Sequence, residues 1–137
     1  MKKLIKSLLL ITWMVLIYYL SSQTGDISKN LSDGLLFKIA SFLKLEPTSF
    51  IHNFSFVFRK LAHFSEYFIL YLLTNSCFKE YGIKNAQIAS LVFCVSYALI
   101  DEIHQLFVNQ RSGELKDVLI DSFGAICAYF LRRLFKK

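Results

Sequence analysis

Long runs of apolar residues alternate with short polar clusters along the chain. Four of these runs are long enough to cross a membrane as helices, since about 20 residues span the hydrocarbon core. Apolar residues fill each run without a period-two alternation, which favours helices over strands. The pattern predicts an all-α polytopic membrane bundle in one domain, 1–137, with four transmembrane helices at about 4–20, 60–78, 87–107 and 114–135.

The connection between the first two runs contains a weaker, amphipathic pattern. Within residues 35–45, Lys38, Ser41 and Lys44 fall on one helical face, and apolar residues fill the other faces. This segment is too short to cross a bilayer, so it predicts a short interfacial amphipathic helix in the first outer loop. The aromatic stretch at 50–58 can extend the second span outward.

Composition and charge distribution both support a membrane protein. Hydrophobic residues make up 55% of the chain, whereas soluble domains average about 45–50%. Basic residues, which give a net charge of +6, gather at both ends of the chain and beside the connection after the second span. Because positive residues collect on the cytoplasmic side, we expect a multi-pass protein of the cell membrane with both termini cytoplasmic. No aromatic-interleaved basic groove is visible in the sequence, which argues against nucleic acid as a partner. These basic residues are Lys2, Lys3, Lys6, Lys79, Lys84, Arg132, Arg133, Lys136 and Lys137.

The outer turns of the last three spans carry ionisable side chains that lipid should exclude. A charged group at mid-membrane costs about 2.5–3.5 kcal/mol on insertion scales, so such groups are usually paired, face the bundle interior or serve a function. The four-span topology places them all on the extracytoplasmic side, above small residues (Gly124, Ala125 and Ala128) that allow close helix approach. We therefore expect one outward-opening polar cavity. Its candidate members are Lys60, His63 and Glu66; Asp101, Glu102, His104 and Gln105; and Glu114, Lys116, Asp117 and Asp121.

These residue types fit three kinds of site. The bases Arg59, Lys60, Arg111 and Lys116 can pair with the acids in a scaffold, although six acids exceed four bases. Histidines and carboxylates can ligate a divalent metal such as zinc or manganese, but no H-E-x-x-H motif is present, and we expect no cofactor. A histidine beside carboxylates can act as an acid or base, while a nearby arginine or lysine binds a phosphate.

Short motifs along the chain match a known family in the expected order. Over nearly its whole length the chain resembles the VanZ-like family, which often has Pro-Gly-Arg where this chain has Asn109-Gln110-Arg111. The family takes its name from an accessory protein of glycopeptide-resistance gene clusters. The resemblance thus implies a cell-envelope process linked to teicoplanin resistance, and it leaves the reaction open. The motifs are Ser21-Ser22-Gln23, K-x-x-H-F-x-E-Y from Lys60 to Tyr67, D-E-x-H-Q from Asp101 to Gln105, Arg111-Ser112-Gly113, Asp117 and Asp121-Ser122-Phe123-Gly124.

The leading hypothesis is an envelope protein whose polar pocket binds an anionic membrane lipid or lipid-linked precursor head group. The first alternative is a membrane enzyme that acts on such a head group, with a histidine as base and with or without a metal. The second is a structural partner of another envelope protein. The core and candidate catalytic residues are His63, Glu66, Asp101 and His104, and the ligand-binding candidates are Gln23, Lys60, Tyr67, Glu102, Gln105, Arg111, Asp117 and Asp121.

Overall fold

The computed structural model describes residues 1–111 and 113–135, and this part of the chain forms helices and no strands. Ser112 of the Arg-Ser-Gly motif and Lys136 and Lys137 of the basic C-terminus lie outside the described residues. The prediction of an all-α fold is confirmed. The helices are α1 (Lys2–Ser21), α2 (Gly25–Phe42), α3 (Pro47–Glu80), α4 (Ala86–Gln105) and α5 (Leu115–Leu134).

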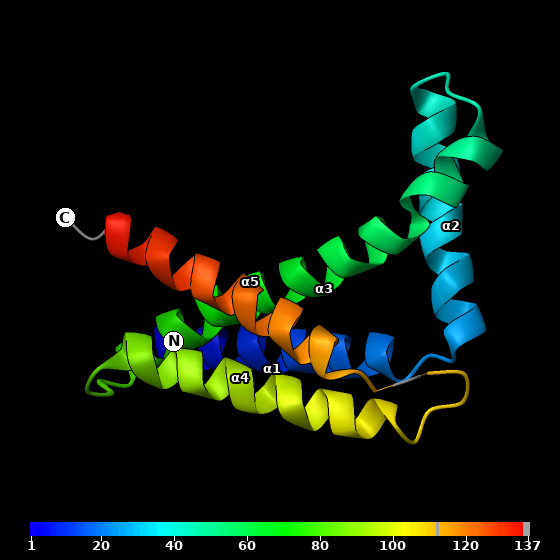
Figure 1. Cartoon of the computed structure of the whole chain (residues 1–137). Coiled ribbons are helices and arrows are strands. Elements are labelled where there is room, and N and C mark those ends of the chain that lie inside the picture. Colours follow the sequence, from blue (N-terminus) through cyan, green and yellow to red (C-terminus); the bar gives the residue numbers. More distant parts are fainter. Residues whose placement is uncertain (112, 136–137) are drawn as a thin grey trace.

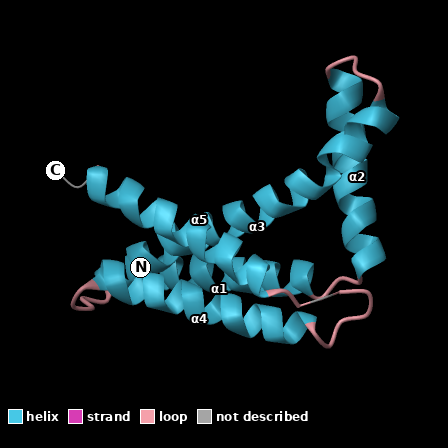
Figure 2. Ribbon diagram, in the orientation of Figure 1, coloured by secondary structure: helices cyan, strands magenta, loops and turns pink. Residues whose placement is uncertain are grey.

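Helix α3 organises the molecule, because it packs against all four other helices. Its second half forms an antiparallel bundle with α1, α4 and α5, and Figure 2 shows the loops confined to the ends of the helices. Both termini and the α3–α4 turn lie at one end of this bundle, called here the terminal end (Figure 1). The end of α1 and the 106–114 connection lie at the opposite end, called here the cavity end.

Helix α2 and the first half of α3 form an arm that rises from the cavity end of the bundle (Figure 1). The prediction of a short helix at 35–45 is wrong in its boundaries, because α2 already begins at Gly25 and ends at Phe42. Short polar residues such as Ser28 and Asp33 resemble loop chemistry in the sequence. In the structure both lie within a continuous helix, and Asp33 also has a partner on a neighbouring segment: Ser55 of α3 donates a hydrogen bond of 2.6 Å to Asp33 Oδ1.

Helix α3 begins with standard capping chemistry. Pro47 occupies the first turn, where its missing N–H costs no hydrogen bond. The Glu46 side chain accepts a hydrogen bond of 2.7 Å from the backbone N–H of Ser49. These interactions with Ser49 lower the pKa of the Glu46 carboxyl below its ordinary value. The helix then continues through the aromatic stretch 50–58 into the predicted second span, so the outward extension expected from the sequence forms.

Two of the helices are long and apolar enough to cross a membrane, Lys2–Ser21 and Ala86–Gln105. The sequence predicted four such spans, so the prediction is supported for the first and third only. Helices α3 and α5 reach the predicted positions, but ionisable side chains such as Lys60, Glu66, Asp117 and Asp121 interrupt their apolar runs.

The crossing of α3 and α5 depends on small residues, as the sequence predicted. A Cβ atom added at Gly124 would lie 2.3 Å from the backbone oxygen of Phe64, which is closer than two such atoms can approach. Ala125 and Ala128 continue this face of α5 and are completely buried. Helices without bulky residues at the contact can bring their backbones together in this way.

Candidate functional site

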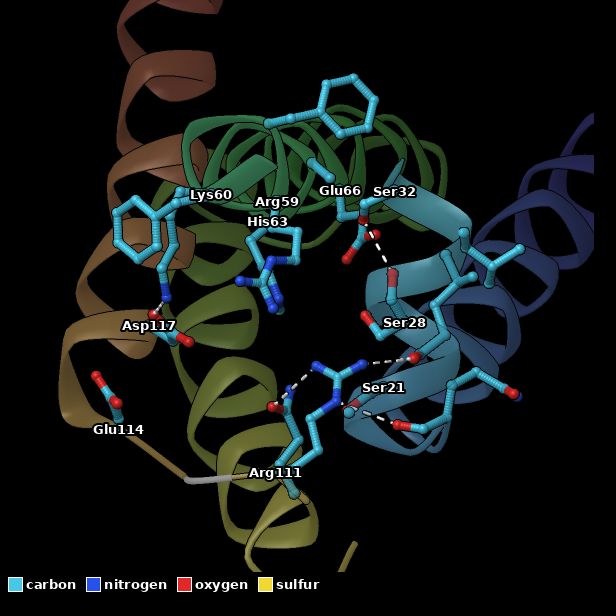
Figure 3. Close-up of a pocket in the computed structure, with 18 of the residues that line it drawn as sticks. Ser21, Ser28, Ser32, Arg59, Lys60, His63, Glu66, Arg111, Glu114 and Asp117 are labelled. Carbon is cyan, nitrogen blue, oxygen red and sulfur yellow. Dashed lines mark hydrogen bonds and ion pairs between the residues drawn. The ribbon is translucent and has the colours of Figure 1, made fainter. Parts of the chain in front are cut away.

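A cavity of about 380 Å³ opens at the cavity end of the bundle. It lies between the end of α1, the arm, the bundle part of α3 and the connection that leads into α5 (Figure 3). The arm contributes the apolar side chains Leu31, Leu35, Phe56 and Phe58 to the lining, together with Ser28 and Ser32. The rest of the lining is mainly polar, so the cavity is amphipathic. Its charged and imidazole-bearing residues are Arg59, Lys60, His63, Glu66, Arg111, Glu114 and Asp117.

Helix α3 supplies three of these polar groups from one face. Arg59, His63 and Glu66 are separated by four and three residues, which is the spacing that stacks side chains along a helix. Figure 3 shows all three pointing into the cavity. The buried Nε of Arg59 has no hydrogen-bond partner among the described residues. Arg59 is therefore a cation with at least one N–H donor that no described residue accepts.

Lys60, the next residue on α3, has a protein partner. Its Nζ forms an ion pair with Asp117 Oδ1 of α5. The same ammonium lies 5.4 Å from the centre of the Phe56 ring, within the range of a cation–π contact. The charge of Lys60 is thus largely balanced inside the structure.

His63 faces α5 on its buried side. Its Nδ1 lies 3.4 Å from Asp121 Oδ1, an ion-pair distance if the imidazole is protonated. Asp121 is completely buried. Neither Asp121 oxygen, His63 Nδ1 nor the buried Tyr67 hydroxyl forms a hydrogen bond of good geometry within the described chain. Buried polar atoms without partners are uncommon and call for an explanation.

Arg111 ties the 106–114 connection to α1 and α4. Its Nε donates to the backbone oxygen of Gln23 at 3.1 Å, and a second nitrogen donates to the backbone oxygen of Leu20 at 3.2 Å. A third contact of 3.4 Å reaches Gln105 Oε1, and Gln105 in turn donates to Asp101 at 3.2 Å. Partial burial removes water from the guanidinium and thereby lowers the pKa of Arg111 from its ordinary value.

The turn before Arg111 adopts an unusual backbone. Gln110 has a φ of 60°, in the left-handed region that glycine enters most easily. The VanZ-like pattern that often reads Pro-Gly-Arg places its glycine at this position. A Cβ atom added at Gly25 would lie 2.2 Å from the Gln110 backbone oxygen, so the turn presses directly against the start of α2.

Two predicted residues have other surroundings. The His104 ring stacks on Tyr18 of α1, with 4.7 Å between ring centres, and His104 does not line the cavity. Glu102 is buried, and its Oε1 accepts a hydrogen bond from the backbone N–H of Glu114 at the start of α5. Both residues therefore contact neighbouring segments outside the cavity wall.

Of the other sequence candidates, Lys116 is exposed and does not line the cavity, and the rest meet in or directly behind it. Those that line it are Gln23, Lys60, His63, Glu66, Gln105, Arg111, Glu114 and Asp117. Those buried nearby are Tyr67, Asp101 and Asp121. Ser28 and Ser32 also line the cavity and were missed, because the sequence analysis placed them in a loop. A helical reading extended back to Gly25 would have revealed them. Within residues 1–111 and 113–135, no group of three or more His, Cys, Asp or Glu residues is placed to hold a metal ion.

Comparison with known proteins gives one match. The family model described as VanZ/LLP1 matches residues 7–136. No curated protein and no solved structure matches the chain. The family match covers nearly all of the chain and agrees with the resemblance read from the K-x-x-H-F-x-E-Y and D-E-x-H-Q motifs. The chain belongs to the VanZ/LLP1 family.

Proposed function

We propose that this protein is a multi-pass membrane protein that binds the anionic head group of an envelope lipid or lipid-linked precursor in its cavity. Helices α1, α4, α5 and the bundle part of α3 cross the membrane, with both termini cytoplasmic and the cavity end outward. The positions of the termini support this topology, since both lie at the same end of the bundle (Figure 1). The basic residues of that end, including Lys2, Lys3 and Lys84, agree with the positive-inside rule.

The observation that carries the proposal is the state of Arg59. Its guanidinium enters an amphipathic cavity, and its buried Nε has no partner among the described residues. An unpaired buried donor is costly, and a charged one more so. An anion in the cavity would supply the missing acceptors, because a guanidinium binds phosphate and carboxylate groups through paired hydrogen bonds.

The other cations take supporting roles. Lys60 is paired with Asp117, and Arg111 donates to two carbonyl oxygens and an amide. Both therefore contribute positive potential from fixed positions, and Arg59 makes the direct contact. The sequence analysis named Lys60 and Arg111 as ligand-binding candidates, and the proposal assigns the direct contact to Arg59 instead.

The apolar wall favours a lipid over a small soluble anion. Leu31, Leu35, Phe56 and Phe58 face the cavity from the arm. A ligand with a charged head and hydrocarbon chains can place the head beside Arg59 and bury the first chain segments against this wall. Lipid chains are already out of water in the bilayer, so this contact adds van der Waals packing, whereas a small soluble anion has no chain to place there.

Native mass spectrometry of the purified full-length protein tests the proposal. We expect an anionic lipid to be retained by the wild type, and Arg59→Gln to lower its retention about tenfold or more, which corresponds to one charged hydrogen-bonding group. Arg132→Gln, an exposed arginine near the end of α5, is the matched control and should retain lipid normally. Equal retention by Arg59→Gln and the wild type would contradict the proposal. A stoichiometric protein partner without lipid would support the structural-partner alternative instead.

A link to glycopeptide resistance can be tested through the same cavity residue, Arg59. If the bound lipid is a cell-wall precursor, expression in a susceptible host should raise the teicoplanin concentration needed to stop growth. The Arg59→Gln variant should lose this effect while remaining in the membrane at the wild-type level. Resistance that is equal for both proteins would separate the phenotype from the cavity.

A further inference from the structure

Head-group binding alone does not explain why a buried acid, Asp121, lies behind His63. Asp121 is completely buried behind His63, where it cannot touch a ligand in the cavity. Its Oδ1 lies 3.4 Å from His63 Nδ1. A buried acid in such a place is expensive unless it stabilises a partner. The partner that the geometry offers is the imidazole.

The arrangement fixes which edge of the imidazole is available. His63 Nδ1 is buried and faces Asp121, whereas the ring as a whole lines the cavity and its side chain retains 17% exposure. With the proton on Nδ1, the nitrogen nearest Asp121, Nε2 carries the free lone pair. The cavity thus contains a base whose orientation is set by a second residue from another helix, an arrangement found in nucleophile-activating sites.

We propose that the protein hydrolyses the phosphoryl head group of the bound lipid. His63 is the general base that activates water, and Asp121 is its positioning residue. This inference rests on the proposed function, since it requires the same ligand in the same cavity. A phosphoryl group is the substrate class because Arg59 and His63 lie one helical turn apart on the same face. A planar guanidinium can hold two phosphate oxygens while the phosphorus lies within reach of the base.

The reaction needs only water as a second reactant. His63 Nε2 removes a proton from a water molecule as the water oxygen forms a bond to phosphorus. The bond between phosphorus and the oxygen of the lipid or phosphate leaving group breaks, and that oxygen receives the proton from the imidazolium. The ester or anhydride is thereby converted into an alcohol or phosphate plus a released phosphate product. Asp121 stays ionised throughout and stabilises the transient imidazolium.

Phosphate release from defined lipids tests this inference. The full-length protein is assayed in micelles with either a polyprenyl pyrophosphate, which contains an anhydride, or phosphatidic acid, which contains a monoester. We expect release from at least one of them, and the active lipid identifies the source. His63→Gln should lower kcat about 100-fold or more, the usual contribution of a general base, with a much smaller loss of lipid retention in native mass spectrometry than Arg59→Gln shows. His52→Gln, an exposed histidine in the arm, is the matched control.

Asp121→Asn separates positioning from folding. It should lower kcat with little change in KM, whereas a purely structural role would lower the amount of folded protein and leave the kinetic ratio intact. If this variant does not fold, ¹⁵N NMR of the wild-type imidazole gives an independent measurement, and the expected tautomer carries the proton on Nδ1.

The outcomes distinguish the two proposals. Wild-type protein that retains lipid but releases no phosphate from either probe overturns the inference and leaves the binding function in place. Full activity in His63→Gln, or a proton on Nε2 in the wild type, also overturns it. Wild-type protein that retains no anionic lipid overturns the binding function itself.

Discussion

The two ends of the bundle differ in which buried polar groups lack hydrogen-bond partners. At the cavity end, His63 Nδ1, the Tyr67 hydroxyl and both Asp121 oxygens are buried without hydrogen-bond partners in the described chain. Towards the terminal end, tight packing dominates, with Ala128 and Cys94 completely buried. Asn75 also lacks partners among the described residues there, but its amide is neutral and costs less to bury than a charge. The buried ionisable groups without partners in the described chain therefore gather in the cavity half of the bundle.

The largest expected effect comes from adding a side chain at the close crossing of α3 and α5. Gly124→Val places a branched side chain where a Cβ atom would already meet the Phe64 backbone oxygen at 2.3 Å. Overpacking usually costs about 1–3 kcal/mol, and here a backbone atom blocks any simple rearrangement. We expect a much lower melting temperature in detergent and loss of lipid retention.

Gly34→Ala is the control for that substitution, because nothing lies within 4 Å of its added Cβ atom. It removes backbone freedom from a helix and should raise stability by up to about 1 kcal/mol. If Gly124→Val melts like the wild type, the close crossing of α3 and α5 is not required for folding.

Two lysines give a smaller contrast between the ends. Lys60→Met leaves the buried Asp117 without its ion-pair partner and should cost about 1–3 kcal/mol. At the terminal end, Lys6 pairs with Glu80 at 2.6 Å, and both side chains are partly exposed. Lys6→Met should therefore have a clearly smaller effect, because water solvates the remaining carboxylate. Chemical denaturation of the two variants compares them directly, and equal losses would contradict the difference between the two environments.

Two tyrosines provide the finest comparison, with opposite expected signs. Tyr67→Phe removes a buried hydroxyl that lacks a partner in the described chain, so the variant should be more stable by about 1 kcal/mol. Tyr71→Phe removes a hydroxyl that donates to the Gln87 backbone oxygen at 3.4 Å and should lower stability by about 0.5 kcal/mol. Melting temperatures of the two variants test the signs. A loss of stability in Tyr67→Phe would show that water or a ligand binds the hydroxyl in the native protein.

The hydrophobic runs predicted most of the helices well. The third and fourth runs, at about 87–107 and 114–135, correspond within two residues to Ala86–Gln105 and Leu115–Leu134. Most residues of these helices are apolar, so the length of each run indicates the length of the helix. The start of α2 could not be predicted in this way, because Ser28 and Ser32 are polar residues that face a cavity created only when the arm folds back on the bundle.

The site was predictable as a set of residues but not as a set of contacts. The cost of charge in a membrane pointed to His63, Asp117 and Asp121 without any structure. The pairing of Lys60 with Asp117, 57 residues apart, depends on how α3 crosses α5. The sequence analysis considered Arg59 as a base that can pair with the acids and did not select it as a binding candidate, because nothing local shows that the arm would enclose its guanidinium.

The Arg111 contacts also set the order in which the cavity can be completed during synthesis. The Leu20 carbonyl at the end of α1 accepts a hydrogen bond from Arg111, which is synthesised 91 residues later. Until that donor emerges from the ribosome, the first helix has no attachment to the 106–114 connection, and the cavity lacks one wall. A nascent chain that stalls after α4 would therefore contain α1 and the arm without a complete cavity.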